Sequence, residues 1–185
     1  MAVAFVTHPH CRLHRMGDDH PEQPARLDVI EEELHVRGLH DLLLHRDAPR
    51  ANVEQLVRVH PLEYVESLAN LSPAEGYVHV DPDTWMCPDT FEAALRAAGA
   101  NVLATDMVVT GEASRAFCNV RPPGHHAERA LTMGFCFFNN VAVAARHALD
   151  HHGLERVAVL DFDVHLGNGT EDIFRDEERV LLCSS

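Results

Sequence analysis

Short apolar runs alternate with longer segments of mixed polarity along most of the chain. Each run is almost continuously apolar over a few residues, at 3–8, 42–45, 114–120, 156–163 and 179–185. We expect these runs to form strands, because short apolar runs bounded by polar residues are typical of buried strands. Strands that are apolar on both faces belong to parallel sheets that helices cover on two sides. The pattern therefore predicts an α/β protein.

The segments between the runs carry the apolar spacing of helices. Leu27, Ile30 and Leu34 recur at helical intervals and a glycine follows, which predicts a helix over about 24–37. Further helices are expected on both sides of Pro61, the first capped by Asn52, and at 89–109, 139–153 and 170–174. The segment 89–109 is nearly all apolar, so we expect this helix to be buried on several sides. Residues 72–88 are rich in Pro, Gly and Ser, which predicts a long loop.

The composition limits the classes of function. The chain has 185 residues, enough for one domain with its own core, and a net charge of −14 at pH 7 with histidine neutral. An acidic chain argues against direct binding of nucleic acid. No apolar run approaches the roughly 20 residues of a membrane span, and the N-terminus lacks the features of a signal peptide. The five cysteines form no CxxC pair, which indicates reduced thiols and a cytoplasmic protein.

Polar side chains gather at the ends of two predicted strands. Asp161, Asp163 and His165 close the run at 156–163. Ligands of parallel sheets bind at the carboxyl ends of strands, so this is the expected place for a site. Asp163 and His165 are two residues apart and lie on one face of an extended strand, where they form a partial shell for Zn²⁺. Because a catalytic zinc normally has three protein ligands, the pair taken alone favours the other interpretation, a helix-capping Asp beside a loop histidine.

A rigid loop follows the other strand. His125 and His126 lie in "RPPGHHA", where the prolines and the glycine fix the path of the chain. The next motif, "MGFCFFNN" at 133–140, either lines an apolar channel or belongs to the core. His151 and His152 form a second histidine pair near a helix end, and we expect that pair to be solvated.

Together, these motifs closely resemble the histone deacetylase family, including bacterial deacetylase-like amidohydrolases and acetylpolyamine amidohydrolases. "RPPGHHA", "GFCFFNN" and "DFDVHLGNGT" follow one another in this order, and "DDHPEQPAR" precedes them. The resemblance covers essentially the whole chain. It implies the arginase/deacetylase fold, a parallel sheet with helices on both faces.

The resemblance implies a role for each of the two loop histidines. Asp161 matches the residue that backs His125, and a carboxylate partner favours an imidazolium ion there. Asn168 matches the residue that backs His126, and an amide gives no such bias. His126 would therefore take a proton from a zinc-activated water and return it to the leaving amine.

By the same resemblance, Asp163 and His165 are zinc ligands, and the ion polarises the amide carbonyl and acidifies the water. The family also binds a monovalent cation, expected here to be K⁺. The matching positions are Asp161, Asp163, His165, Ser184 and Ser185 for a first cation and Phe174 and Val180 for a second, peripheral one.

Four further residues match positions that contact the substrate. Phe135 matches a wall of the acyl-lysine tunnel, and the Gly134 carbonyl matches an acceptor for the substrate amide. Arg26 matches an arginine of the inner cavity. Asp83 matches a rim aspartate that holds the substrate backbone, by a looser alignment.

The sequence departs from the family pattern at two points. Leu166 stands where a second histidine commonly follows the zinc histidine, and we expect only altered packing around the site. The family's third zinc ligand, an aspartate, and its transition-state tyrosine belong to a segment beyond Ser185. We therefore expect 1–185 to be the N-terminal part of one deacetylase domain, with a sheet that lacks its middle strands.

These expectations combine into one function and two alternatives. The expected reaction is zinc-dependent hydrolysis of the N-acetyl amide of a lysine or a polyamine, with 1–185 alone inactive. One alternative is a module that binds acylated amines or a partner chain without catalysis. The other is a two-metal ureohydrolase, which would need a ligand where Gly167 stands. Neither nucleic acid nor a membrane is an expected partner, and a homo-oligomer is left open.

Overall fold

A three-stranded parallel sheet forms one side of the molecule. The computed structural model describes residues 2–184. In this first sheet, β1 (Val3–Thr7) lies between β2 (Leu43–Asp47) and β5 (Arg115–Cys118). Val3 pairs with Leu43 on one side and with Arg115 on the other. Each strand coincides with a predicted apolar run.

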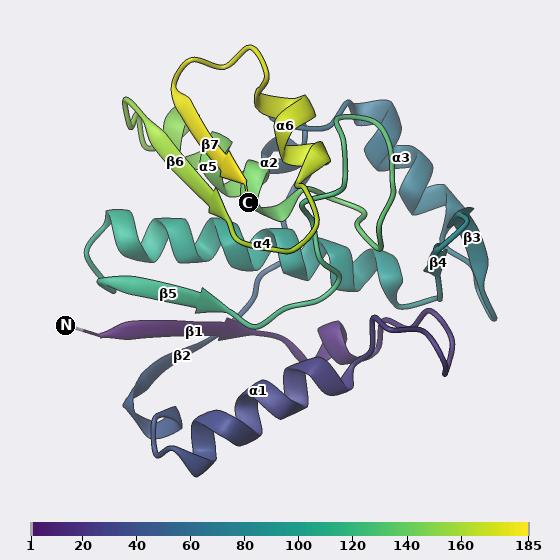
Figure 1. Ribbon diagram of the computed structural model, residues 1–185, viewed down its shortest axis with the longest axis horizontal. Helices are drawn as coiled ribbons and strands as arrows, with labels where there is room; N and C mark the ends of the chain where they lie inside the picture. The colour runs from purple at the N-terminus through teal and green to yellow at the C-terminus, as the bar shows by residue number, and fades with distance from the viewer. Residues whose placement is uncertain (1, 185) are drawn as a thin grey trace.

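Two further strands form a second parallel sheet. β6 (Val157–Asp161) pairs with β7 (Val180–Ser184), so that Asp161 lies opposite Ser184. Within residues 2–184, no strand joins this sheet to the first one. A cavity of about 340 Å³ lies instead between the end of β5 and the strand β6. Figure 1 shows the two sheets apart, and that further strands belong between them stays a prediction.

Helices connect and cover the strands. The helices are α1 (Ala25–Val36), α2 (Val53–Leu56), α3 (Leu62–Leu71), α4 (Thr90–Val109), α5 (Asn140–Asp150) and α6 (Asn168–Phe174), with short 3₁₀ turns at Pro9–Arg12 and His40–Leu42. The predicted helices are confirmed. Asn52 caps α2 through the backbone N–H of Gln55, as its position indicated.

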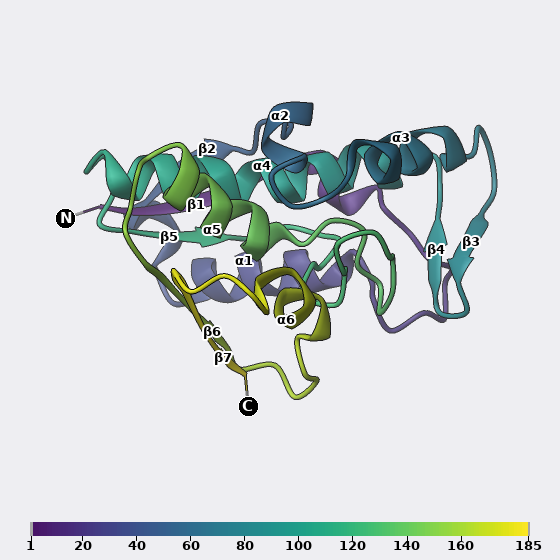
Figure 2. The ribbon, with the colours of Figure 1, turned by 90° about the horizontal axis from the view of Figure 1, so that it is seen from above.

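The long helix α4 is the centre of the packing. It contacts β1 and β5 of the first sheet, and α5 packs against α4 on one side and β6 on the other (Figure 2). Ala93, Ala97 and Ala100 of α4 are fully buried, which confirms the prediction from its apolar sequence. No helix of the described residues is long and apolar enough to cross a membrane.

The prediction of a long loop at 72–88 is wrong. This segment contains an antiparallel hairpin, β3 (Val78–Asp81) and β4 (Thr84–Met86), that turns at Pro82 and Asp83. The strands are short and the register is irregular, so the density of Pro and Gly obscured the alternation of side chains. Met86 is fully buried, which anchors the hairpin in the core.

Candidate active site

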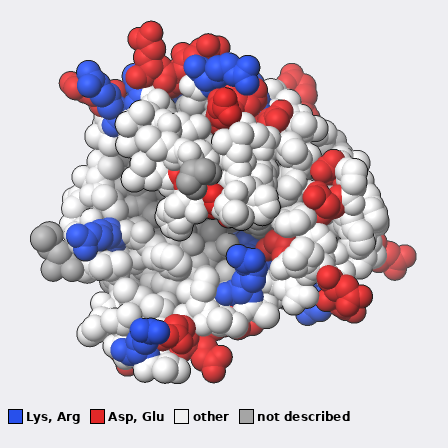
Figure 3. All heavy atoms as spheres, in the orientation of Figure 1, with Lys and Arg blue, Asp and Glu red and all other residues white. Residues whose placement is uncertain are grey.

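A cavity of about 390 Å³ opens beyond the carboxyl end of β5. Half of the fourteen site residues that sequence reasoning singled out line it: Arg26, Asp83, His125, His126, Gly134, Phe135 and His165. They come from α1, from the β3–β4 turn and from the loops that follow β5 and β6. Figure 3 shows a hollow at the centre of this face, with both acidic and basic side chains at its margin. The topology therefore gathers segments that are up to about 140 residues apart in sequence.

His125 is held from behind by Asp161. Its Nδ1 lies 2.8 Å from Asp161 Oδ2, and both side chains are mostly buried. The other carboxylate oxygen of Asp161 accepts the backbone N–H of Asp163 at 3.2 Å. Because both oxygens are engaged, the carboxylate has one orientation. The ring of His125 is fixed in turn, with Nε2 as the nitrogen not engaged by Asp161.

His126 is held by an amide whose orientation is also set. Its Nδ1 lies 2.7 Å from Asn168 Oδ1. The amide nitrogen of Asn168 donates to Glu128 Oε1 at 3.0 Å, so its oxygen must face the histidine. His126 then donates through Nδ1, and in the neutral form of the ring Nε2 carries the lone pair. This is the protonation pattern of a neutral imidazole that can accept a proton.

The glycine-rich turn after β6 is explained by a close approach. A Cβ atom on Gly167 would lie 2.4 Å from Asp161 Oδ2. Only glycine therefore lets the chain pass behind Asp161 and begin α6 at Asn168. The N–H of Thr170 in that helix donates to the carbonyl of His125 at 3.2 Å, which joins the turn to the histidine loop.

Asp163 and His165 form an exposed pair next to the tandem histidines. Asp163 Oδ1 lies 3.0 Å from His165 Nδ1 and accepts the backbone N–H of His165 at 2.9 Å. The backbone N–H of His165 is the main reason why the pKa of Asp163 is lowered. The rings of His165 and His126 have centroids 5.9 Å apart.

This pair fits a zinc ion in chemistry and in spacing. Two ligands of a tetrahedral zinc lie about 3.3 Å apart, close to the separation of these two side chains. The pair supplies two ligands where a catalytic zinc has three. Among residues 2–184, the side chains that do group as three or more metal ligands lie elsewhere, around Asp106.

The aromatic motif divides between the cavity and the core. Phe137 and Phe138 are each 1% exposed and belong to the core, whereas Phe135 lines the cavity. Phe135 has a φ of 69°, which is rare for a residue with a side chain. Its N–H donates to Thr84 Oγ1 at 2.9 Å, so the unpredicted hairpin holds this wall in place.

Asp83 and Arg26 lie at the edge of the cavity. Thr84 Oγ1 donates to Asp83 Oδ1 at 3.1 Å, and His20 Nε2 bonds to the Asp83 carbonyl at 3.0 Å. Arg26 is exposed on α1. Both residues line the cavity, and their contacts with a substrate stay predictions.

The residues assigned to monovalent cations lie in two places. Ser184 Oγ accepts the N–H of Gly167 at 3.5 Å, near Asp161 in the paired strand, while Ser185 lies outside the described residues. Phe174 is buried and Val180 packs against the same core. The carbonyl of Phe174 accepts the N–H of Glu177 at 3.0 Å. Cation binding at either place stays a prediction.

A buried ion pair that lines the cavity was missed by sequence reasoning. Arg121 donates to both carboxylate oxygens of Glu22 at 2.5 Å, and to the carbonyls of Cys11 and His14. Burial would raise the pKa of Glu22, but hydrogen bonds from His14 and Arg121 outweigh it and lower the pKa to about 2. Both residues stand inside quoted motifs, where Arg121 was interpreted only as the entry to a rigid turn.

The buried histidine His60 supports the loop that carries His125 and His126, and sequence reasoning missed it as well. His60 Nε2 accepts the N–H of Asn139 at 3.0 Å, and its Nδ1 bonds to the carbonyl of Arg129 at 3.0 Å. Burial lowers the pKa of His60 to about 4. A neutral imidazole therefore ties the middle of the loop, at Arg129, and its end, at Asn139, to His60 before α3. The position of His60 directly before Pro61 gave no signal of this role.

Comparison with known proteins supports the resemblance. A model described as the histone deacetylase domain matches residues 20–185. The chain is 45% identical over 165 residues to a histone deacetylase-like amidohydrolase of Pseudomonas aeruginosa, covering 89% of this chain and 43% of that protein. It is 39% identical over 199 residues to the human polyamine deacetylase HDAC10, covering 100% of this chain and 29% of that one.

A solved structure agrees with the sequence matches. The HDA15 HD domain superimposes with a TM-score of 0.93 at 34% identity, covering 99% of this chain and 53% of that one. The chain spans less than half the length of the Pseudomonas amidohydrolase and of human HDAC10. Its α/β architecture is that of the arginase/deacetylase fold, and the chain belongs to the histone deacetylase family.

Proposed function

We propose that this chain is the N-terminal part of a zinc-dependent deacetylase domain that hydrolyses N-acetyl amides of lysine or of a polyamine. The observation that carries the proposal is the pair of supported histidines. His125 with Asp161 and His126 with Asn168 stand side by side at one cavity, with the zinc-type pair next to them. Relatives named as deacetylases of both substrate kinds support the same reaction class.

The two histidines divide the chemistry. His126, with a lone pair on Nε2, accepts a proton from the attacking water and later gives it to the leaving amine. His125, oriented by Asp161, donates a hydrogen bond to the oxygen on which negative charge develops. Asp163 and His165 would hold Zn²⁺, which when bound supplies Lewis-acid polarisation of the amide carbonyl.

The cavity suits an extended acyl-amine. Phe135 forms an apolar wall for the methylene chain, and the Gly134 carbonyl beside it accepts the amide N–H. A Cβ on Gly134 would lie 2.4 Å from the His126 ring, so the carbonyl and the general base are necessarily close. Asp83 at the edge attracts the cationic part of the substrate, and Arg26 lines the same space.

The remaining parts of the site belong to a segment outside 1–185. We place the third zinc ligand and the transition-state tyrosine there, together with the strands that fill the space between β5 and β6. The chain alone is then inactive. A K⁺ ion beside Asp161 and Ser184 would neutralise charge at the ends of the paired strands.

The ureohydrolase alternative is not supported by the geometry. A second metal ion would need a ligand at position 167, where a Cβ atom already clashes with Asp161. A side chain there would displace the residue that supports His125.

The test is acetate release by the protein extended through the coding sequence beyond Ser185. With acetylated lysine peptide and acetylated polyamine as substrates, His126→Ala should lower kcat by about 10²–10⁴-fold. The matched control is His35→Ala, an exposed histidine of α1 that does not line the cavity, which should leave kcat unchanged. Equal rates for wild type and His126→Ala would overturn the proposal.

A further inference from the structure

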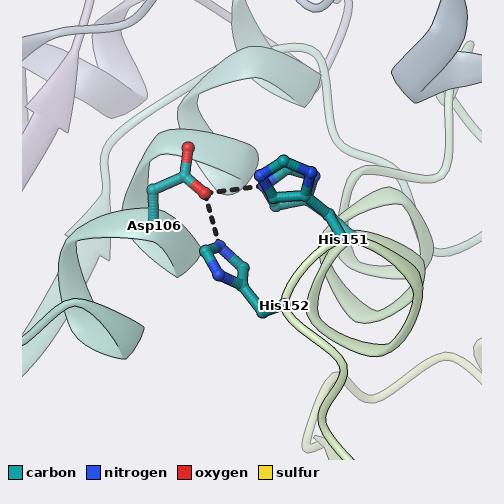
Figure 4. Close-up of side chains that lie close together, drawn as sticks. Asp106, His151 and His152 are labelled. Carbon is teal, nitrogen blue, oxygen red and sulfur yellow. Dashed lines mark hydrogen bonds and ion pairs between the residues drawn. The ribbon is translucent and has the colours of Figure 1, made fainter.

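Four ionisable side chains meet where the C-terminal ends of α4 and α5 come together. Asp106 belongs to the last turn of α4, His147 to the last turn of α5, and His151 and His152 follow that helix directly. One ligand atom of each lies within 4.8 Å of those of the others. Figure 4 shows the carboxylate of Asp106 facing the rings of His151 and His152. None of these residues belongs to the cavity described above.

Hydrogen bonds already orient the carboxylate. Asp106 Oδ1 lies 2.6 Å from His147 Nε2 and 2.7 Å from His152 Nε2. Desolvation would raise the pKa of Asp106, but these bonds outweigh it, so the pKa is lowered. The expectation that His152 is solvated is therefore wrong, because Asp106 on the neighbouring helix holds it.

His147 and the other two histidines differ in what they can still bind. Arg58 Nη1 donates to His147 Nδ1 at 2.8 Å, which leaves the proton of His147 on Nε2, directed at Asp106. His147 is thus committed as a donor that positions the carboxylate. His151 is exposed, its ring stacks on His147 with centroids 4.6 Å apart, and its centroid lies 4.9 Å from that of His152.

We propose that Asp106, His151 and His152 bind a divalent transition-metal ion of the zinc and nickel class. Two imidazole nitrogens and one carboxylate oxygen suit such ions, whereas Ca²⁺ and Mg²⁺ prefer oxygen ligands. The two hydrogen bonds to Asp106 come from His147 and His152. Neither bond explains why the ring of His151 lies beside the same carboxylate. The distance between His152 Nε2 and Asp106 Oδ1 must increase by about half an ångström to reach the spacing of two zinc ligands. His152 follows the end of α5, which allows this shift.

The ion would join α4 to the end of α5. Asp106 and the histidines come from two helices that otherwise meet through apolar side chains, and a shared ion adds a polar clamp at their open ends. Metal binding to the folded chain alone stabilises it by mass action. Zn²⁺ should therefore raise the thermal midpoint by way of this cluster.

The experiment measures Zn²⁺ bound per chain by equilibrium dialysis. To remove the other zinc-type pair, it uses the Asp163→Ala/His165→Ala background. We expect one ion per chain, not displaced by excess Mg²⁺, and more than about 100-fold weaker binding in His151→Ala. His147→Gln, which removes no proposed ligand but takes away the ring that positions Asp106, should cost about 10–100-fold.

The controls separate a metal site from a hydrogen-bonded helix contact. His151 is exposed and its removal leaves both bonds to Asp106 in place, so this variant folds. His40→Ala/His45→Ala removes two of the stacked surface histidines elsewhere and should not change binding. Equal Zn²⁺ binding in the background chain and in His151→Ala, or no bound Zn²⁺ in the background chain, would overturn the proposal.

Discussion

At the scale of single residues, the site depends on what stands behind each functional group. Asp161 and Asn168 are both engaged by a second partner, so neither can turn away from its histidine. Gly167 provides the space in which this arrangement closes. The polar cluster after β6 is therefore a support for the histidine loop as much as a set of ligands.

Replacing Gly167 by alanine should break that support. The added methyl group would lie 2.4 Å from Asp161 Oδ2, so Asp161 must shift away from His125. We expect a loss of about 1–3 kcal/mol in the free energy of unfolding, measured by urea titration. Gly153→Ala is the control. Its Cβ meets nothing within 4 Å, and only the positive φ of 68° costs about 1 kcal/mol. Equal losses in the two variants would contradict the contact with Asp161.

Glu22→Gln should leave Arg121 buried without its counter-charge. We expect a loss of about 3–5 kcal/mol at pH 7, against about 0.5 kcal/mol for Glu33→Gln in the exposed pair with Arg37. The folded pKa of Glu22 is about 2, below its ordinary 4.5. This stabilisation is therefore complete above pH 4.5 and is lost as the pH falls towards 2. Acid unfolding curves of wild type and variant that stay parallel would contradict it.

At the level of helices and strands, apolar periodicity predicted the parallel strands and the helices, but it did not predict the hairpin of β3 and β4. β1, β6 and β7 fall on nearly continuous apolar runs, and α1, α2 and α5 have a cap or a glycine stop that can be seen in the sequence. β3 and β4 are held together by contacts from distant segments, such as the bond from Phe135 N–H to Thr84. Propensity cannot reveal a strand whose stability comes from such contacts.

The loop that carries the tandem histidines should depend on a neutral His60. The unfolded chain takes up a proton at His60 near pH 6.5, and the folded chain does so only near pH 4. Stability from this residue is complete above pH 6.5 and falls by about 3 kcal/mol as the pH drops to 4. The imidazole NMR signals of folded His60 should stay in the neutral form at pH 5.5, while those of exposed His35 serve as an internal control. A His60 midpoint near pH 6.5 would contradict the burial argument.

At the scale of the whole molecule, two parallel sheets stand apart around a cavity. Leu160 and Phe162 of the β6 segment are 71% and 91% exposed, although the run to which they belong has the apolar pattern of a buried strand. That mismatch between sequence and burial was foreseeable from the family resemblance alone. The residue contacts around His125 and His126 were also foreseeable from it, whereas the buried partners Glu22, Arg121 and His60 carry no motif of their own.

We propose above that residues 1–185 carry one part of a deacetylase active site. The most direct test compares acetate release from acetylated lysine peptide and acetylated polyamine by chain 1–185 and by the protein extended beyond Ser185. We expect zinc-dependent release by the extended protein and none by 1–185. Zinc-dependent release by 1–185 at the rate of the extended protein, or no release by either, would contradict it.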